Sequence, residues 1–248
     1  MQLLNSVAIV TGAGSGIGRS VALAYAAEGA KVVVSDIHRK EGLETVNMIK
    51  QAGGESFFFE ADVSSPADNA ALVDVAVATY GALHIACNNA GIGGASAPVG
   101  EYPIEAWDKV IGINLSGIFY GMHYQIPAML NAGGGTIVNM ASILGNVGFA
   151  NSPAYVAAKH GVVGLTKNIA LEYGTKGIRA NAVGPAFIKT PLLKDLDAGT
   201  LDWLVTKHPI GRLGEPEEVA ELVLWLSSSK SSFVTGSYYP VDGGYLAG

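Results

Sequence analysis

The N-terminal segment constrains the fold most, because a strand pattern, a glycine cluster and a helix pattern follow one another there. Val7 to Val10 is a short apolar run typical of a buried strand, and apolar residues recur at helical spacing from Arg19 to Glu28. Between these patterns lies Gly12-x-x-x-Gly16-x-Gly18. Glycine lets the backbone approach a diphosphate, and a helix N-terminus supplies N–H donors and a positive dipole end. The segment therefore predicts a dinucleotide site, although the spacing is not Gly-x-Gly-x-x-Gly and an ordinary β–α turn is the alternative.

Strand and helix patterns alternate along the rest of the chain without a repeat or a linker. The predicted strands are residues 7–10, 31–35, 56–59, 83–87, 135–140, 178–183 and 237–241. The predicted helices are residues 19–28, 40–51, 66–80, 104–130, 152–173 and 216–226. This alternation predicts one α/β domain over residues 1–248, a three-layer sandwich with a Rossmann-type doubly wound parallel sheet of about seven strands and helices on both faces. Segment 191–209 breaks the rhythm, which predicts a substrate-binding lid at about residues 190–210.

Composition narrows the class of protein. Hydrophobic residues make up 49% of the chain and charged residues only 15%, which indicates a large core or a surface buried against copies of the same chain. The net charge of −6, without a basic run, argues against nucleic acid as a partner. The single Cys87 excludes an intrachain disulfide, and we find neither a cationic leader nor an apolar run of membrane-spanning length. We therefore expect a soluble cytoplasmic protein that does not enter a membrane.

Tyr155 and Lys159 are the first candidate catalytic pair. They lie four residues apart on the predicted helix 152–173, so they share one face of it. An ammonium beside a phenol favours the phenolate and lowers the tyrosine pKa from about 10 toward neutrality, which would make Tyr155 a general acid/base. The alternative is a half-buried tyrosine and a solvated lysine on a structural helix, since Tyr-x-x-x-Lys arises easily by chance.

Polar side chains at predicted strand ends support the functional interpretation of this pair. Asp36 lies 18 residues after Gly18, about where an acidic residue meets the adenosine ribose hydroxyls. Its charge would repel a 2′-phosphate and favour NAD over NADP; the nearby His38 and Arg39 weaken this preference, and an aspartate capping the next helix is the alternative. Further residues fall at the carboxyl ends of predicted strands, where open parallel sheets bind ligands: Asp62, Asn89, Ser142 and Pro185.

The motifs together resemble those of the short-chain dehydrogenase/reductase family, and specifically its NAD-preferring members of about this length. The resemblance covers nearly the whole chain and rests on Thr11-Gly12-x-x-x-Gly16-Ile17-Gly18, Asp62-Val63, Asn88-Asn89-Ala90-Gly91, Asn114, Ser142, Tyr155-x-x-x-Lys159 and Val241-Asp242-Gly243-Gly244. It implies an NAD-dependent oxidoreductase that transfers a hydride between a nicotinamide and a secondary alcohol or ketone. In this family the protein supplies position and a tuned proton site, and the cofactor supplies the hydride chemistry.

The resemblance also implies roles for individual residues. Tyr155 would exchange a proton with the substrate oxygen, which Ser142 would hold by a hydrogen bond. Lys159 would lower the tyrosine pKa and bind the nicotinamide ribose, and Asn114 would organise a water that links Lys159 to solvent. Without the resemblance, Ser142 could be a strand-end turn serine and Asn114 an asparagine at a helix bend. The implied cofactor-binding residues are Gly12, Ser15, Gly16, Ile17, Gly18, Asp36, Ile37, Asp62, Val63, Asn89, Ala90, Gly91, Tyr155, Lys159, Pro185, Ile188 and Thr190.

Three further expectations follow from the resemblance. The family usually has Pro-Gly where this chain has Pro185-Ala186, so cofactor contacts near residue 186 are open to change. A homotetramer is implied, built through the helices that carry Asn114 and Tyr155 and through the C-terminal strand. Metal ligands are not implied.

The expected substrate is an uncharged secondary alcohol or ketone, for example a cyclic or aromatic one. The implied substrate-contacting residues are Ser142, Leu144, Tyr155, Phe187 and Trp203, and the pocket wall is expected to include Gly93, Gly94, Asn146 and the segment 192–203. These residues are mostly apolar and include no arginine cluster. A dehydratase or epimerase of the same fold and a non-catalytic NAD-binding redox sensor are the alternative functions.

Overall fold

The computed structural model describes residues 1–194 and 196–248, and its centre is one parallel sheet of seven strands in the order β3-β2-β1-β4-β5-β6-β7. The strands are β1 (Val7–Thr11), β2 (Lys31–Asp36), β3 (Glu55–Glu60), β4 (Ile85–Asn88), β5 (Gly135–Met140), β6 (Ile178–Pro185) and β7 (Tyr238–Val241). The strand order reverses direction beside β1, between β1 and β4. A reversal of this kind opens a crevice at the carboxyl ends of the strands.

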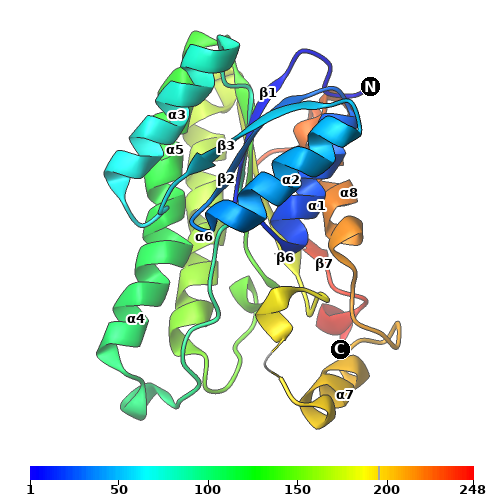
Figure 1. The fold of residues 1–248 in the computed structure, drawn as a ribbon. Helices are drawn as coiled ribbons and strands as arrows, with labels where there is room; N and C mark the ends of the chain where they lie inside the picture. The colour runs from blue at the N-terminus through cyan, green and yellow to red at the C-terminus, as the bar shows by residue number, and fades with distance from the viewer. Residues whose placement is uncertain (195) are drawn as a thin grey trace.

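Helices cover both faces of the sheet (Figure 1). On one face lie α1 (Gly16–Ala27), α2 (Arg39–Gln51) and α8 (Pro216–Ser227), and on the other lie α3 (Pro66–Tyr80), α5 (Gly117–Asn131) and α6 (Pro153–Tyr173). The helix α4 (Ile104–Ile111) continues the line of α5, and α7 (Ala198–Thr206) lies beyond the carboxyl ends of the strands.

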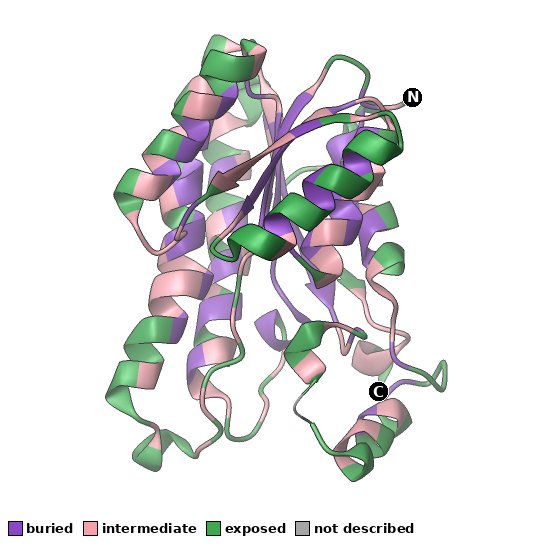
Figure 2. Cartoon of the chain, viewed as in Figure 1, coloured by how far each residue is buried: buried purple, intermediate pink, exposed green. Residues whose placement is uncertain are grey.

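The inner strands are buried on both faces because their side chains alternate between two hydrophobic clusters, whereas the edge strands β3 and β7 are partly exposed. In β2, Val32 and Val34 pack with α1, α2 and α8, whereas Val33 packs with the cluster of α3, α5 and α6. Figure 2 shows the buried strands at the centre and the exposed outer faces of the helices. The predicted three-layer, doubly wound sheet is therefore confirmed. No helix in the described part of the chain is long and apolar enough to span a membrane.

Two predicted segments differ from the structure. The helix predicted at residues 104–130 is divided, because a π-helical turn at Gly112–Ser116 separates α4 from α5, and Pro127 lies inside α5. The predicted lid at about 190–210 contains the nine-residue helix α7 between short turns, so it is less irregular than expected. Asp195, within that predicted lid, lies outside the described residues.

Candidate active site

A cavity of about 910 Å³ lies along the carboxyl ends of the strands. It is lined by residues at the ends of six strands, among them Asp36 at the end of β2, Met140 at the end of β5 and Pro185 at the end of β6. Of the predicted site residues, the cavity lining includes Gly12, Ser15, Gly16, Ile17, Asp36, Ile37, Asp62, Val63, Asn89, Ala90, Gly91, Ser142, Leu144, Tyr155, Lys159, Pro185, Phe187, Ile188, Thr190 and Trp203. Gly18 and Asn114 lie behind the cavity surface, where they contact residues that line it.

The glycine turn between β1 and α1 has the shape that a diphosphate requires. Gly12 and Gly16 have φ of +62° and +51°, a conformation that other residues rarely adopt. A Cβ on Gly18 would lie 2.2 Å from the carbonyl oxygen of Gly12, so only glycine lets helix α1 begin this close to the strand. The side-chain amide of Asn89 donates to the carbonyl of Thr11 at 2.9 Å and so joins β4 to this turn. The residues therefore fit a dinucleotide whose diphosphate lies at the N-terminus of α1.

Asp36 joins the glycine turn to the segment that follows β2. One carboxylate oxygen accepts the Gly14 N–H at 2.8 Å, and the other accepts the His38 N–H at 2.9 Å. The N-cap residue of α2 is His38, so Asp36 is not the helix-capping residue of the alternative interpretation. Arg39 does not line the cavity and lies 3.7 Å from Glu60, at ion-pair distance. The carboxylate of Asp36 therefore lies in the cavity lining and is fixed beside the glycine turn, as expected of a residue that meets an adenosine ribose.

Tyr155 and Lys159 share the face of α6 that lines the cavity, as their spacing predicts. The Lys159 Nζ lies 5.5 Å from the centroid of the Tyr155 ring and donates to the carbonyl oxygen of Met140 at 2.7 Å. Ser142 follows β5, and its hydroxyl accepts the N–H of Leu144 at 3.2 Å. The phenol, the ammonium and the hydroxyl therefore come together at one place in the cavity.

The pKa values at this place differ from the prediction. Burial raises the pKa of Tyr155 above its ordinary value of 10, and the Ser142 side chain acts in the opposite direction. Burial lowers the pKa of Lys159 from 10.5 to about 8. The predicted lowering of the tyrosine pKa by Lys159 is therefore wrong for this structure, because burial of the phenol itself has the largest effect and the Lys159 ammonium is directed at the Met140 carbonyl. The phenol is protonated at neutral pH, which suits it to donate a proton to a carbonyl oxygen.

Asn114 lies in the π-helical turn and is completely buried. Its side-chain oxygen accepts the Ile92 N–H at 2.9 Å, and its nitrogen donates to the Ile92 carbonyl at 2.8 Å. Both ends of the amide are thus used to hold the segment after β4, which carries the cavity residues Ala90 and Gly91.

The part of the cavity formed by residues 92–96, 142–155, 187–194 and 196–204 is called the substrate end below. Its aromatic residues are Phe149, Phe187 and Trp203, besides Tyr155. The Phe149 ring lies between the other two, with its centroid 6.0 Å from that of Phe187 and 6.4 Å from that of Trp203. Sequence reasoning missed Phe149, since it lies in an irregular loop without a pattern. Asn146 was wrongly expected on the wall, because it is exposed and terminates the 3₁₀ turn Ile143–Gly145.

Known proteins match nearly the whole chain. A family model described as "Enoyl-(Acyl carrier protein) reductase" matches residues 12–246. A solved short-chain type dehydrogenase/reductase from Mycobacterium marinum superposes with a TM-score of 0.96 at 35% identity, over 100% of this chain and 98% of that one. This chain belongs to the short-chain dehydrogenase/reductase family. Family members of the dehydrogenase type use a nicotinamide cofactor, NAD or NADP, and the glycine turn described above fits one.

Two of the similar relatives are named as dehydrogenases of cyclohexane-derived alcohols. The chain is 54% identical to a cyclohexanol dehydrogenase of Acinetobacter sp. (strain SE19), over 98% of this chain and 96% of the relative. It is 44% identical to a cis-4-hydroxycyclohexanecarboxylate dehydrogenase of Sinomonas cyclohexanicum, over 97% and 96%. A solved levodione reductase superposes with a TM-score of 0.92 at 38% identity, over 99% of both chains. The predicted class, an oxidoreductase acting on CH–OH groups, is confirmed.

Proposed function

We propose that this protein is an NAD-dependent dehydrogenase that interconverts a neutral cyclic secondary alcohol and its ketone. The observation that carries the proposal is the substrate end of the cavity, which joins Ser142 and Tyr155 to three aromatic rings. In the described part of that lining, no Asp, Glu, Lys or Arg side chain is present to pair with a charged substrate. The name of the cyclohexanol dehydrogenase supports a neutral cyclic substrate, and the name of the hydroxycyclohexanecarboxylate dehydrogenase supports the cyclic part of the proposal alone. Segment 190–210 would be the lid, since its Leu192, Trp203 and Leu204 line this end.

The residues have distinct roles in the proposed reaction. Ser142 donates a hydrogen bond to the substrate oxygen and holds it at the Tyr155 hydroxyl. Tyr155 donates its proton to that oxygen in ketone reduction and removes the proton in alcohol oxidation. Lys159 binds the cofactor ribose, and Asn114 holds segment 90–92 against the same region and organises a water for proton exchange with Lys159. The bound nicotinamide supplies or accepts the hydride.

Turnover of matched substrates tests this proposal. We would follow NADH absorbance at 340 nm with cyclohexanol and with cis-4-hydroxycyclohexanecarboxylate. We expect kcat/KM to be at least about tenfold higher for cyclohexanol. The described lining of the substrate end has no cation to pair with a buried carboxylate, and the Lys159 ammonium beside it is directed at Met140. A preference for the carboxylate would contradict the neutral substrate class. A redox sensor would give no NADH with any alcohol, and an epimerase would give product without net NADH.

The cofactor preference is tested separately through Asp36. Its carboxylate is held by two backbone N–H groups, and its charge would repel the 2′-phosphate of NADP. We expect Asp36→Asn to keep these contacts in part and to raise the NADP-to-NAD ratio of kcat/KM by about tenfold or more. Glu60→Gln is the matched control, because it removes a carboxylate near Arg39 outside the cavity lining. An unchanged ratio for Asp36→Asn would place discrimination elsewhere.

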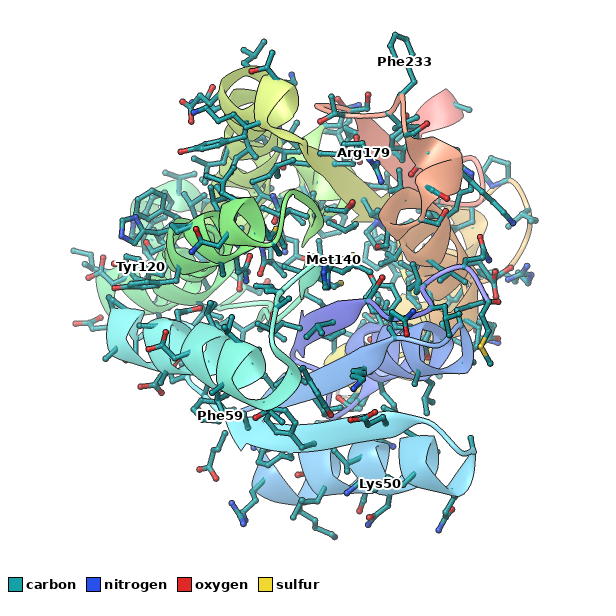
Figure 3. All side chains as sticks on the ribbon, turned by 90° about the horizontal axis from the view of Figure 1, so that it is seen from above. Lys50, Phe59, Tyr120, Met140, Arg179 and Phe233 are labelled. Carbon is teal, nitrogen blue, oxygen red and sulfur yellow. The ribbon has the colours of Figure 1, made fainter. Side chains whose placement is uncertain are left out.

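We propose that the functional form is a homotetramer. A groove between α5 and α6 exposes apolar surface from Leu115, Phe119, Tyr120 and Leu165, with Gly161 and Gly164 at its base. Near β7, the Phe233 ring is fully exposed and projects from the surface (Figure 3). Exposed apolar surface of this kind is typical of an interface. Light scattering after gel filtration should give four times the 25.5 kDa chain mass, and a monomer would refute the proposal.

A further inference from the structure

His208 is a buried histidine that follows α7 and lies behind the cavity surface, 3% exposed. Its Nδ1 lies 2.8 Å from the carbonyl oxygen of Leu204, and its Nε2 lies 3.4 Å from the backbone nitrogen of Phe187. A carbonyl oxygen only accepts and a backbone N–H only donates. Both hydrogen bonds therefore exist together only when the imidazole is neutral and carries its hydrogen on Nδ1.

The His208 ring also belongs to a three-ring cluster, defined as His208, Phe187 and Tyr245. The centroid of the His208 ring lies 5.9 Å from that of Phe187 and 5.7 Å from that of Tyr245, and both pairs have edge-to-face geometry. The centroids of Phe187 and Tyr245 are 6.1 Å apart. Phe187 lies in the segment after β6, His208 in the segment after α7, and Tyr245 in the C-terminal turn. Edge-to-face packing of aromatic rings is favourable and fixes their relative orientation.

The two hydrogen bonds of His208 reach two different walls of the substrate end. Phe187 forms one wall, and it is the only member of the three-ring cluster that lines the cavity. Helix α7 forms the other wall through Trp203 and Leu204, and His208 donates to the Leu204 carbonyl at the C-terminal end of that helix. Phe149 fills the space between the walls. One imidazole therefore links the Phe187 wall to the α7 wall from behind.

We propose that His208 is a positioning residue that sets the separation of these two walls and thereby the size of the ring that the enzyme accepts. The inference rests on the proposed function, since it assigns the size selectivity of that same site. The imidazole acts through Phe187 and α7 and does not touch the substrate. Without it, the walls separate, a small ring fits loosely and a larger ring enters.

Two conservative variants separate the two hydrogen bonds. In His208→Gln the side-chain amide reaches the position of Nε2 and can still accept the Phe187 N–H. Because residue 208 follows the end of α7 by two residues in the chain, this one bond still links the Phe187 wall to the α7 wall. In His208→Asn the amide nitrogen matches Nδ1 and can donate only to Leu204, so the link to Phe187 is lost. His208→Ala removes both bonds and the ring. His84→Gln is the matched control, because its Nδ1 also accepts a backbone N–H, that of Val7 at 3.0 Å, but at the opposite end of the sheet.

The experiment measures kcat and KM with NAD for cyclohexanol and cyclooctanol, together with NADH binding and the melting temperature of each variant. For His208→Asn and His208→Ala we expect KM for cyclohexanol to rise about tenfold with kcat changed less than threefold. We also expect the cyclooctanol-to-cyclohexanol ratio of kcat/KM to rise about tenfold. For His208→Gln we expect the KM for cyclohexanol and the cyclooctanol-to-cyclohexanol ratio of kcat/KM to lie within about threefold of the wild-type values. We expect the same of the control His84→Gln.

The outcomes distinguish this inference from the proposed function. If wild type oxidises cyclohexanol but the ratio is unchanged in both His208→Asn and His208→Ala, the inference is overturned and the proposed function stands. Parallel loss of kcat and NADH affinity in all three His208 variants would also overturn it, because that pattern indicates a general structural role. If wild type oxidises no cyclic alcohol, the proposed function and this inference fall together.

Discussion

The buried Lys159 should make the folded protein less stable than a chain without it. Its side chain is 3% exposed, and burial lowers its pKa from 10.5 to about 8. A shift of this size, about 2.5 units at about 1.4 kcal/mol each, means that the charged form costs about 3 kcal/mol of folding free energy at neutral pH. Replacement by methionine removes this cost but also the hydrogen bond to Met140, worth about 1 kcal/mol. Lys159→Met should therefore raise the free energy of unfolding by about 2 kcal/mol.

The pH dependence of this difference follows from the direction of the shift. Below pH 8 the lysine is charged in both the folded and unfolded states, so the folded protein bears the full cost. Between pH 8 and 10.5 the folded state releases its proton while the unfolded state keeps it, and wild type gains stability as the pH rises. The advantage of Lys159→Met should therefore narrow by about 2 kcal/mol between pH 7 and pH 9.5.

Urea unfolding of the cofactor-free proteins at pH 7 and pH 9.5 measures both effects. Lys167→Met is the matched control, because Lys167 is exposed on the same helix, and we expect it to change stability by less than about 0.5 kcal/mol at either pH. If Lys159→Met is less stable than wild type at pH 7, or if its advantage is equal at both pH values, the burial argument is refuted. The variant should lose turnover in either case, which would be a stability–activity trade-off.

Three further predictions concern the proton site and the glycine turn. Tyr155→Phe should lower kcat by about 10²–10⁴-fold, a typical acid/base contribution, with NADH affinity measured by fluorescence nearly unchanged; retained turnover would reject the tyrosine mechanism. Because the pKa of Tyr155 is raised, kcat/KM for alcohol oxidation should keep rising with pH to above pH 9. For ketone reduction, kcat/KM should stay level through neutral pH. If kcat/KM for oxidation reached a plateau near pH 7, this prediction would be contradicted. Gly18→Ala should destabilise the fold by about 1–3 kcal/mol in urea, because its Cβ would meet the Gly12 carbonyl, whereas Gly174→Ala, in open space, should not.

Sequence patterns located the strands well because burial on both faces leaves an unambiguous apolar run. The strand predicted at residues 135–140 matches β5 at both ends, and the helix predicted at 66–80 matches α3, where Pro66 and the Ser65 cap mark the start. Residues placed at strand ends lined one cavity for the same reason, since parallel strands bring their carboxyl ends to one edge. The cavity residues that lie directly at strand ends could therefore be predicted from the sequence.

The sequence could not give features that depend on packing between distant segments. Phe149 and His208 lie in loops, and their contacts with Phe187 join segments that follow β5, β6 and α7. The π-helical turn could not be predicted from the sequence, because the apolar pattern continues through it from α4 to α5. The direction of the Tyr155 pKa was wrong because spacing along α6 shows that an ammonium is near but not how deeply both groups are buried or which carbonyl the ammonium meets.

Two locally unfavourable features, a π-helical turn and a buried ammonium, lie at one corner of the cavity. A Cβ on Gly91 would lie 3.2 Å from the side-chain oxygen of Asn114 and 3.8 Å from the Lys159 Nζ, so the three residues meet there. Asn114 lies in a π-helical turn, and Lys159 is a buried ammonium; each is unfavourable in a chain selected for stability alone. Irregular helical turns and buried charges persist where the surrounding structure holds them for function. The buried ammonium of Lys159 and the π-helical turn at Asn114 are therefore two independent observations that support the proposed active site at this corner.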